Sequence, residues 1–144
     1  MRTFYLFKIN DEYSKLTKNI PYNLYNTYLN MKLSNKDNYK YIEKQYKNIT
    51  SDLKKEELNK LISDILIYSD SYTIYRNIHQ YNNYFSKEVS RLIIYNTFMI
   101  LETNIIESIF LNILKNIPNL FIIDFINKDY FWLKEFITCP KVRY

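Results

Sequence analysis

Few side chains in this 144-residue sequence could carry chemistry, and they are scattered along the chain. The only histidine, His79, has no second histidine or cysteine at metal-ligand spacing, which favours a structural role over a catalytic one. The only cysteine, Cys139, stands beside Pro140 and is interpreted as an unreactive thiol rather than a nucleophile. Asp124 interrupts an apolar run. A buried carboxylate can be catalytic, but ending a strand by hydrogen bonding to nearby backbone is the favoured role.

Glycine is absent from the sequence, which excludes the glycine-rich loops that cradle phosphate groups. Because no acid, base, nucleophile and metal ligand form a recognisable set, we expect a protein that is not an enzyme and needs no cofactor or metal. The absence of glycine also has a structural consequence. Asparagine is the next most tolerant residue, so turns that need positive φ should fall largely to asparagine.

The charge and aromatic content leave two kinds of partner open. The chain has 20 basic and 15 acidic residues, a formal net charge of +5 and 16 tyrosines. Basic residues interleaved with aromatic ones occur in nucleic-acid-binding proteins. Here the two kinds are spread along the chain and mixed with acids, as on a solvated surface, and AT-rich codons alone would produce much of this profile. A small basic nucleic-acid-binding protein remains the alternative to a protein-binding function.

Length and apolar content favour a single cytoplasmic domain spanning residues 1–144. A chain of this length buries enough surface to fold without disulfides. Its one cysteine cannot form an internal bridge, which fits a reducing compartment. The N-terminal apolar run from Phe4 to Phe7 is followed directly by Lys8 and is too short for a signal peptide or a membrane span. We therefore expect no association with a membrane.

Hydrophobic periodicity predicts an α+β or mixed α/β domain with a sheet of about five strands flanked by about five helices. The expected strands are 2–9, 72–78, 90–95, 97–102 and 120–125, the last buried on both faces because it is apolar nearly throughout. Five helices are expected. Three of them span residues 11–17, 39–49 and 104–117, and Asn104 with Glu107 marks the start of the last. One further helix begins at Pro21, and another has its cap within residues 50–52. Residues 80–86 should form a loop, and the chain should end in a tail.

Two of the predicted helices have distinct sides. In the helix 39–49, an apolar side consists of Ile42, Tyr46 and Ile49. The opposite side carries long, polar side chains and should face solvent or a partner: Tyr41, Lys44, Gln45 and Asn48. In the following helix an apolar stripe is expected at Leu58, Leu61, Ile62, Ile65 and Leu66.

Three segments of the sequence share a pattern with a known family. The most specific is C-terminal and contains residues 109–117 (IFLNILKNI), 121–125 (FIIDF), 127–130 (NKDY) and 132–133 (WL). The others are the start, with Arg2, the aromatic strand to Phe7 and residues 11–13 (DEY), and the middle, with residues 43–45 (EKQ) and 49–50 (IT). Together they resemble the sporulation inhibitor of replication proteins, SirA, of endospore-forming bacilli. The resemblance covers nearly the whole chain and is weak between residues 53 and 91. Phe131 stands where the family has glycine.

This resemblance implies a non-catalytic protein that binds domain I, the N-terminal domain, of the replication initiator DnaA. It would inhibit initiation at the origin during sporulation by occluding a surface that the initiator needs, without a small-molecule substrate and without binding nucleic acid directly. The implied partner surface combines the segment after the first strand with the exposed side of the helix that carries EKQ. Carried over by position, its residues are Tyr13, Thr17, Lys44, Gln45, Asn48 and Ile49. Thr17 and Asn48 replace aromatic residues of the family.

Overall fold

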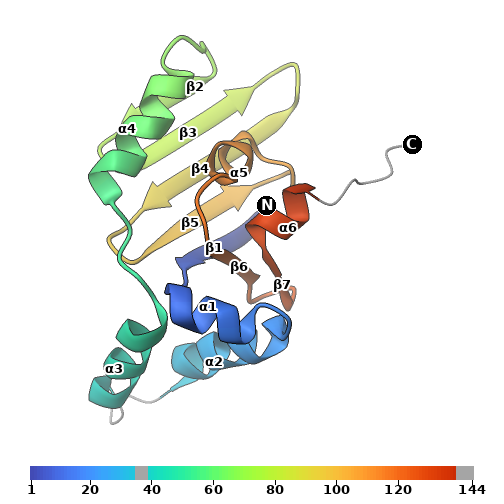
Figure 1. Cartoon of the computed structure of the whole chain (residues 1–144). Coiled ribbons are helices and arrows are strands. Elements are labelled where there is room, and N and C mark those ends of the chain that lie inside the picture. The colour runs from blue at the N-terminus through green and yellow to red at the C-terminus, as the bar shows by residue number, and fades with distance from the viewer. Residues whose placement is uncertain (35–38, 139–144) are drawn as a thin grey trace.

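The computed structural model describes residues 1–34 and 39–138, which build one antiparallel sheet with helices on both faces (Figure 1). The strands are β1 (Arg2–Lys8), β2 (Tyr72–Tyr75), β3 (Ile78–Asn83), β4 (Glu88–Ile94), β5 (Phe98–Thr103), β6 (Leu120–Asp124) and β7 (Asp129–Trp132). The helices are α1 (Asp11–Thr17), α2 (Pro21–Leu33), α3 (Tyr39–Ile49), α4 (Lys55–Leu66), α5 (Ile109–Leu114) and α6 (Leu133–Thr138). The mixed α/β class is confirmed, but the sheet has seven strands rather than about five, and the described residues form six helices rather than about five.

The N-terminal strand lies inside the sheet, as its aromatic sequence predicts. The strand order is β2-β3-β4-β5-β1-β6-β7, and β1 pairs antiparallel with β5 on one side and β6 on the other. Successive side chains of a strand point to opposite faces of the sheet. Phe4 and Leu6 therefore enter one hydrophobic core, whereas Phe7 enters the other. One short strand thus contributes to both cores.

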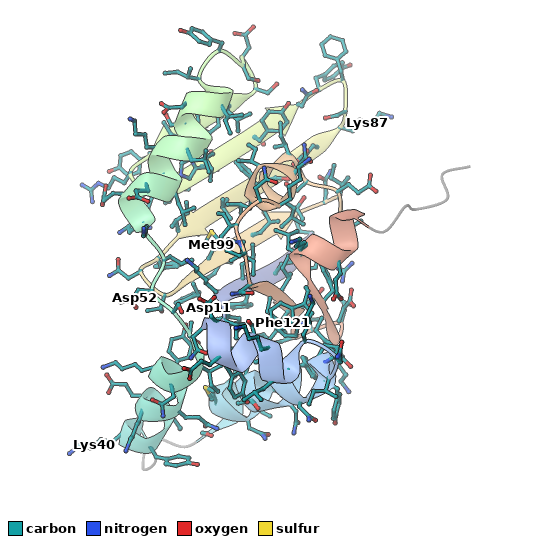
Figure 2. All side chains as sticks on the ribbon, in the orientation of Figure 1. Asp11, Lys40, Asp52, Lys87, Met99 and Phe121 are labelled. Carbon is teal, nitrogen blue, oxygen red and sulfur yellow. The ribbon has the colours of Figure 1, made fainter. Side chains whose placement is uncertain are left out.

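The two faces of the sheet carry different helices. The first core contains residues of α4 and α5 and the first residue of α6, Leu133. The second core contains residues of α2 and the last residue of α3, Ile49. Helices α1, α2 and α3 gather at the end of the sheet formed by β6 and β7, and α4 lies toward the opposite end (Figure 1). Figure 2 shows Lys40 of α3 and Lys87, between β3 and β4, at these two opposite ends of the molecule.

Strand β6 is buried on both faces, as its apolar run predicts. All five of its residues are buried. Leu120 and Ile122 belong to the first core, and Phe121 and Ile123 to the second. The hairpin predicted around Asn96 is also confirmed, because β4 and β5 pair antiparallel on either side of it.

The other strand predictions need correction. Residues 72–78 are not one strand: the chain turns back at Arg76 and Asn77, and β3 occupies most of the stretch expected to be a loop. Gln80 and Asn82 give β3 the composition of a loop, although His79 and Tyr81, which alternate with them, are buried. Strand β7 and helix α6 were not expected, and Phe131, where the family resemblance has glycine, lies within β7.

The last long helix predicted from the sequence is much shorter in the structure. Helix α5 is preceded by Ser108, whose hydroxyl accepts a hydrogen bond from a backbone N–H of the first turn (3.2 Å). Asn104, the expected start, instead accepts from the Val89 N–H (2.8 Å) and donates to the Lys87 carbonyl (2.7 Å). These tertiary hydrogen bonds extend the contact between β5 and β4, and they outweigh the local capping preference of asparagine.

The cap predicted for α4 is also wrong. The helix is preceded by Lys54, which makes no side-chain capping hydrogen bond. The Thr50 hydroxyl instead lies 2.5 Å from the Tyr28 hydroxyl, and Ser51 donates its N–H to the Lys8 carbonyl (2.7 Å). These expected capping residues therefore connect α2 and the end of β1 to the segment that follows α3.

The apolar stripe of α4 is narrower than its sequence suggests. Leu58, Ile62 and Leu66 are buried in the first core, but Leu61 and Ile65 are exposed. The buried residues recur at i and i+4, which is the spacing of one ridge of a helix packed on a sheet. This ridge makes the apolar contact of α4 with the first core.

Positive φ angles fall mainly on basic residues, contrary to the expectation for asparagine. Among the described residues, positive φ occurs at Arg76, Lys87, Asn119 and Lys128. A left-handed backbone costs a non-glycine residue on the order of 1–2 kcal/mol. The three basic side chains are exposed, so adopting it does not force them against the packed core. The neighbouring Asn77 acts through its side chain instead, donating to the Ile94 carbonyl (2.8 Å).

His79 lies on β3, is completely buried and contacts α4. Its Nδ1 lies 2.7 Å from the Tyr72 hydroxyl, and its Nε2 lies 2.7 Å from Oδ1 of Asn59. Because an amide oxygen only accepts, Nε2 carries the proton and Nδ1 accepts from the tyrosine. Burial lowers the pKa of His79 from about 6.5 to about 4. The ring is therefore neutral near pH 7, as a structural histidine linking α4 to the sheet.

We predict that His79 makes stability depend on pH between about 6.5 and about 4. In this window the unfolded chain binds a proton at His79 and the folded protein does not, so the free energy of unfolding falls as the pH is lowered. The full loss is on the order of 3 kcal/mol. Urea melts at several pH values should show it, and His79→Gln should flatten this part of the curve. Parallel curves for the two proteins would contradict the assignment.

Candidate functional site

Asp124, the acid that could have been catalytic, is a structural junction. It is buried and accepts from the backbone N–H groups of Ile126 and Asn127 (both 3.1 Å), from the Asn127 side chain (2.6 Å) and from Nε of Arg2 (2.9 Å). Burial alone would raise its pKa, but the hydrogen bonds from Asn127 and Arg2 and the charge of Arg2 lower it overall. The expectation that Asp124 ends its strand on nearby backbone is confirmed.

Residues 1–34 and 39–138 contain no group of three or more His, Cys, Asp and Glu side chains that could hold a metal ion. No helix in this part of the chain is long and apolar enough to cross a membrane. Cys139 lies outside the described residues. The surface implied by the family resemblance lies on α1 and α3.

Helix α1 begins where β1 ends, and Asn10 forms its N-cap. The Asn10 side-chain oxygen accepts from the Tyr13 N–H at 2.7 Å, and Asp11 and Glu12 place negative charge in the first turn, where the helix dipole favours it. Tyr13 is half-buried and packs against the second core. Thr17 is only 4% exposed and donates its hydroxyl to the Tyr13 carbonyl (2.7 Å).

Asn10 also joins α1 to α3. Its side-chain amide donates to the Asn48 carbonyl, and its backbone N–H donates to the Ile49 carbonyl at 2.8 Å. Directly before it, Ile9 forms an isolated antiparallel bridge with Thr50. One residue therefore caps the N-terminus of α1 and occupies carbonyls at the C-terminus of α3. The two segments singled out by the resemblance, far apart in sequence, lie side by side.

The α3 candidates divide between surface and core. Lys44 and Asn48 are exposed, and Gln45 is half-buried. Ile49 is only 4% exposed and belongs to the second core. Tyr46 fixes the inner side of the helix, since its hydroxyl donates to Oγ1 of Thr97 next to β5 (3.1 Å). The predicted division of α3 into an apolar and a polar side is therefore confirmed, with Ile49 on the apolar side.

Two exposed side chains extend this surface. Tyr41 lies one turn before Lys44 on the polar side and is 70% exposed. Leu16 of α1 is 73% exposed although it is fully apolar. Sequence reasoning missed Leu16, and the available signal was its position three residues after Tyr13, on the neighbouring turn of the same helix. We call the set Tyr13, Leu16, Tyr41, Lys44, Gln45 and Asn48 the α1–α3 surface.

Lys44 gives the α1–α3 surface a positive charge, and side chains of both signs lie close to its members in sequence. On α3, Lys47 pairs with Glu43 one turn earlier (3.1 Å), and Lys44 stands on the same helix. On α1, Asp11 binds the Asn119 amide (2.7 Å). Burial raises the pKa of Tyr46 beneath the surface, so this phenol stays neutral. Exposed apolar groups beside long polar side chains are also the composition of many protein interfaces.

Comparison with known proteins identifies a matching family. The family model described as sporulation inhibitor of replication protein SirA matches residues 2–136 of the chain. The match therefore spans both segments of the α1–α3 surface. No curated protein matches the chain.

We predict that substitutions can separate the two roles of the Asn10 side chain, which caps α1 and bonds to α3. Asn10→Ala removes the cap and the side-chain bond to α3, keeps the backbone bond to Ile49, and should cost about 1–2 kcal/mol of stability. Asn10→Ser keeps a capping oxygen but is too short to reach the Asn48 carbonyl. Amide hydrogen exchange should then show the Tyr13 N–H protected in Asn10→Ser and unprotected in Asn10→Ala. Equal loss of protection in both variants would contradict the assigned cap.

Proposed function

Because the chain belongs to the family of sporulation inhibitors of replication, SirA, we propose that it inhibits initiation by binding domain I of the replication initiator DnaA. The proposed inhibitor acts in the cytoplasm during sporulation, without catalysis or cofactor. It binds through the α1–α3 surface and covers a region that the initiator needs for self-association or for recruiting other replication factors. Inhibition is then stoichiometric, with one chain occupying one initiator domain.

The observation that carries this proposal is the Asn10 junction. The family resemblance points to two short segments, and a shared binding surface requires them to be adjacent. The hydrogen bonds of Asn10 to Tyr13, Asn48 and Ile49 hold them together through backbone groups that do not depend on the identity of the surface side chains. A surface held in this way is organised before binding, which lowers the entropy cost of association.

The six candidate residues have different roles in the proposal. Lys44 and Asn48 are exposed and contact the partner directly, and Gln45 contacts it through its exposed part. Tyr13 is the aromatic anchor, since it packs against the second core and is only partly buried. Thr17 and Ile49 are buried and act by holding the two helices in place.

We expect Lys44→Glu to weaken binding to domain I at least about tenfold, or about 1.4 kcal/mol. Its matched control is Lys60→Glu, which makes the same charge reversal at an exposed position of α4, toward the other end of the sheet. The measurement is a calorimetric titration of the full chain with domain I from the same organism. Equal affinities for the two variants would mean that the α3 face is not the interface.

Tyr13→Ala should weaken binding by about 2 kcal/mol, because central aromatic anchors dominate such interfaces. The substitution also removes packing from the second core, so a thermal melt must accompany it. Tyr130→Ala is the matched control, since Tyr130 is also a half-buried tyrosine packed on that core but lies on β7. If both variants lose stability and both keep wild-type affinity, Tyr13 is a core residue only.

The same titration distinguishes the alternative function. A random-sequence DNA duplex replaces domain I, and both titrations are repeated over a range of salt concentrations. Binding driven by phosphate contacts weakens steeply with salt and tolerates many sequences, whereas a packed protein interface responds far less. A saturable complex with domain I and none with DNA supports the proposed function. Salt-sensitive binding to DNA without a domain I complex would replace it with nucleic-acid binding.

A further inference from the structure

The two edge strands of the sheet, β2 and β7, differ in how exposed they are. Strand β2 is the terminal strand at the end opposite the α1–α3 surface (Figure 1). Thr73, Ile74 and Tyr75 are all exposed there, and Ile74 is 45% exposed. At the other edge, the first three residues of β7 are half-buried, and the strand is covered by α2 and α6. Strand β2 therefore presents the more open edge of the sheet.

The backbone of β2 can accept a further strand. The Asn82 N–H donates to the Ser71 carbonyl (3.0 Å), and antiparallel ladders alternate along each strand. Thr73 and Tyr75 consequently direct their backbone groups toward β3. The N–H and carbonyl of Ile74 are directed away from the sheet, as in an edge strand prepared for pairing.

The sequence of β2 lacks most of the devices that usually block such an edge. Natural edge strands are protected by lysine, proline, bulges or inward-pointing charges, or by being short. Residues 72–75 (YTIY) contain no charge and no proline, and their register with β3 is unbroken. Only the shortness of the strand limits pairing, so an added strand would bind weakly and reversibly.

The charges that flank β2 select the partner. Asp70 precedes the strand and Arg76 follows it, and both are exposed. The Arg76 guanidinium lies over the Tyr75 ring, 5.3 Å from its centroid, on the same end of the strand. Antiparallel pairing of β2 with a second β2 brings the Asp70 end of each copy next to the Arg76 end of the other. The edge is therefore self-complementary, as a two-fold interface requires.

We propose that two copies of this chain associate weakly through their β2 edges, forming one continuous sheet across a two-fold axis. Since β2 is the edge farthest from β6 and β7, this pairing leaves both α1–α3 surfaces exposed at the outer ends of the dimer. If those surfaces bind the initiator, a consequence that rests on the proposed function, the dimer is a bivalent inhibitor. Its affinity then rises where initiator molecules are clustered.

Sedimentation equilibrium of the full chain, without any partner, tests the pairing. Between about 10 µM and about 1 mM, the apparent mass should rise from one chain toward two, as expected for a small interface. Ile74→Lys should raise the dissociation constant at least tenfold. The matched control is Val89→Lys, because Val89 is also a strand residue that is 45% exposed, but it lies on the internal strand β4. A monomer at every concentration, or equal effects of the two variants, would overturn the proposal.

A charge exchange tests the direction of pairing. Asp70→Arg alone and Arg76→Asp alone should each weaken the dimer by placing like charges opposite one another. The double variant Asp70→Arg/Arg76→Asp restores opposite charges and should recover most of the wild-type association. Absence of this recovery would overturn antiparallel β2 pairing. These measurements contain no initiator. A negative result would therefore overturn the dimer without affecting the proposed binding to domain I, which the titration tests separately.

Discussion

The pairing of β1 with both β5 and β6 is the constraint on which the rest of the structure depends. It joins the first residues of the chain to strands about a hundred positions later, with Arg2 opposite Thr103 and Tyr5 opposite Ile123. Without β1 the sheet would divide into β2–β5 and β6–β7, and each core would lose its central strand. The ion pair of Arg2 with Asp124 adds a side-chain link at the same seam. The place of β1 in the sheet also fixes the position of Asn10, which lies two residues after the end of the strand.

The Asn10 junction connects the central strand β1 to the α1–α3 surface. The chain leaves the sheet at Ile9, pairs briefly with Thr50, and enters α1 with one side-chain amide shared between two helices. The proposed binding residues are thus carried by helices whose positions are set by backbone hydrogen bonds and by the second core.

The sequence predicted those elements whose local pattern agrees with their final environment. The bounds of α1 and α3 were predicted as found, and β6 was predicted to be buried because both of its faces are apolar. Elements decided by distant partners were not predicted: Asn104 has the pattern of a helix cap but bonds to β4, and Ser108 begins the helix instead. The candidate surface shows the same limit. Sequence spacing did not indicate that Thr17 is buried, whereas the predicted apolar side of α3 already contained Ile49.

The most direct measurement of the central claim is a nuclear magnetic resonance titration of the isotope-labelled full chain with unlabelled domain I of the initiator. We predict that the amide signals of residues 11–17 of α1 and 41–49 of α3 shift or broaden as one group and saturate at one equivalent. Signals of β2 and α4, at the opposite end of the sheet, should remain unchanged. A response concentrated on β2 and α4, or no response at saturating domain I, would contradict it.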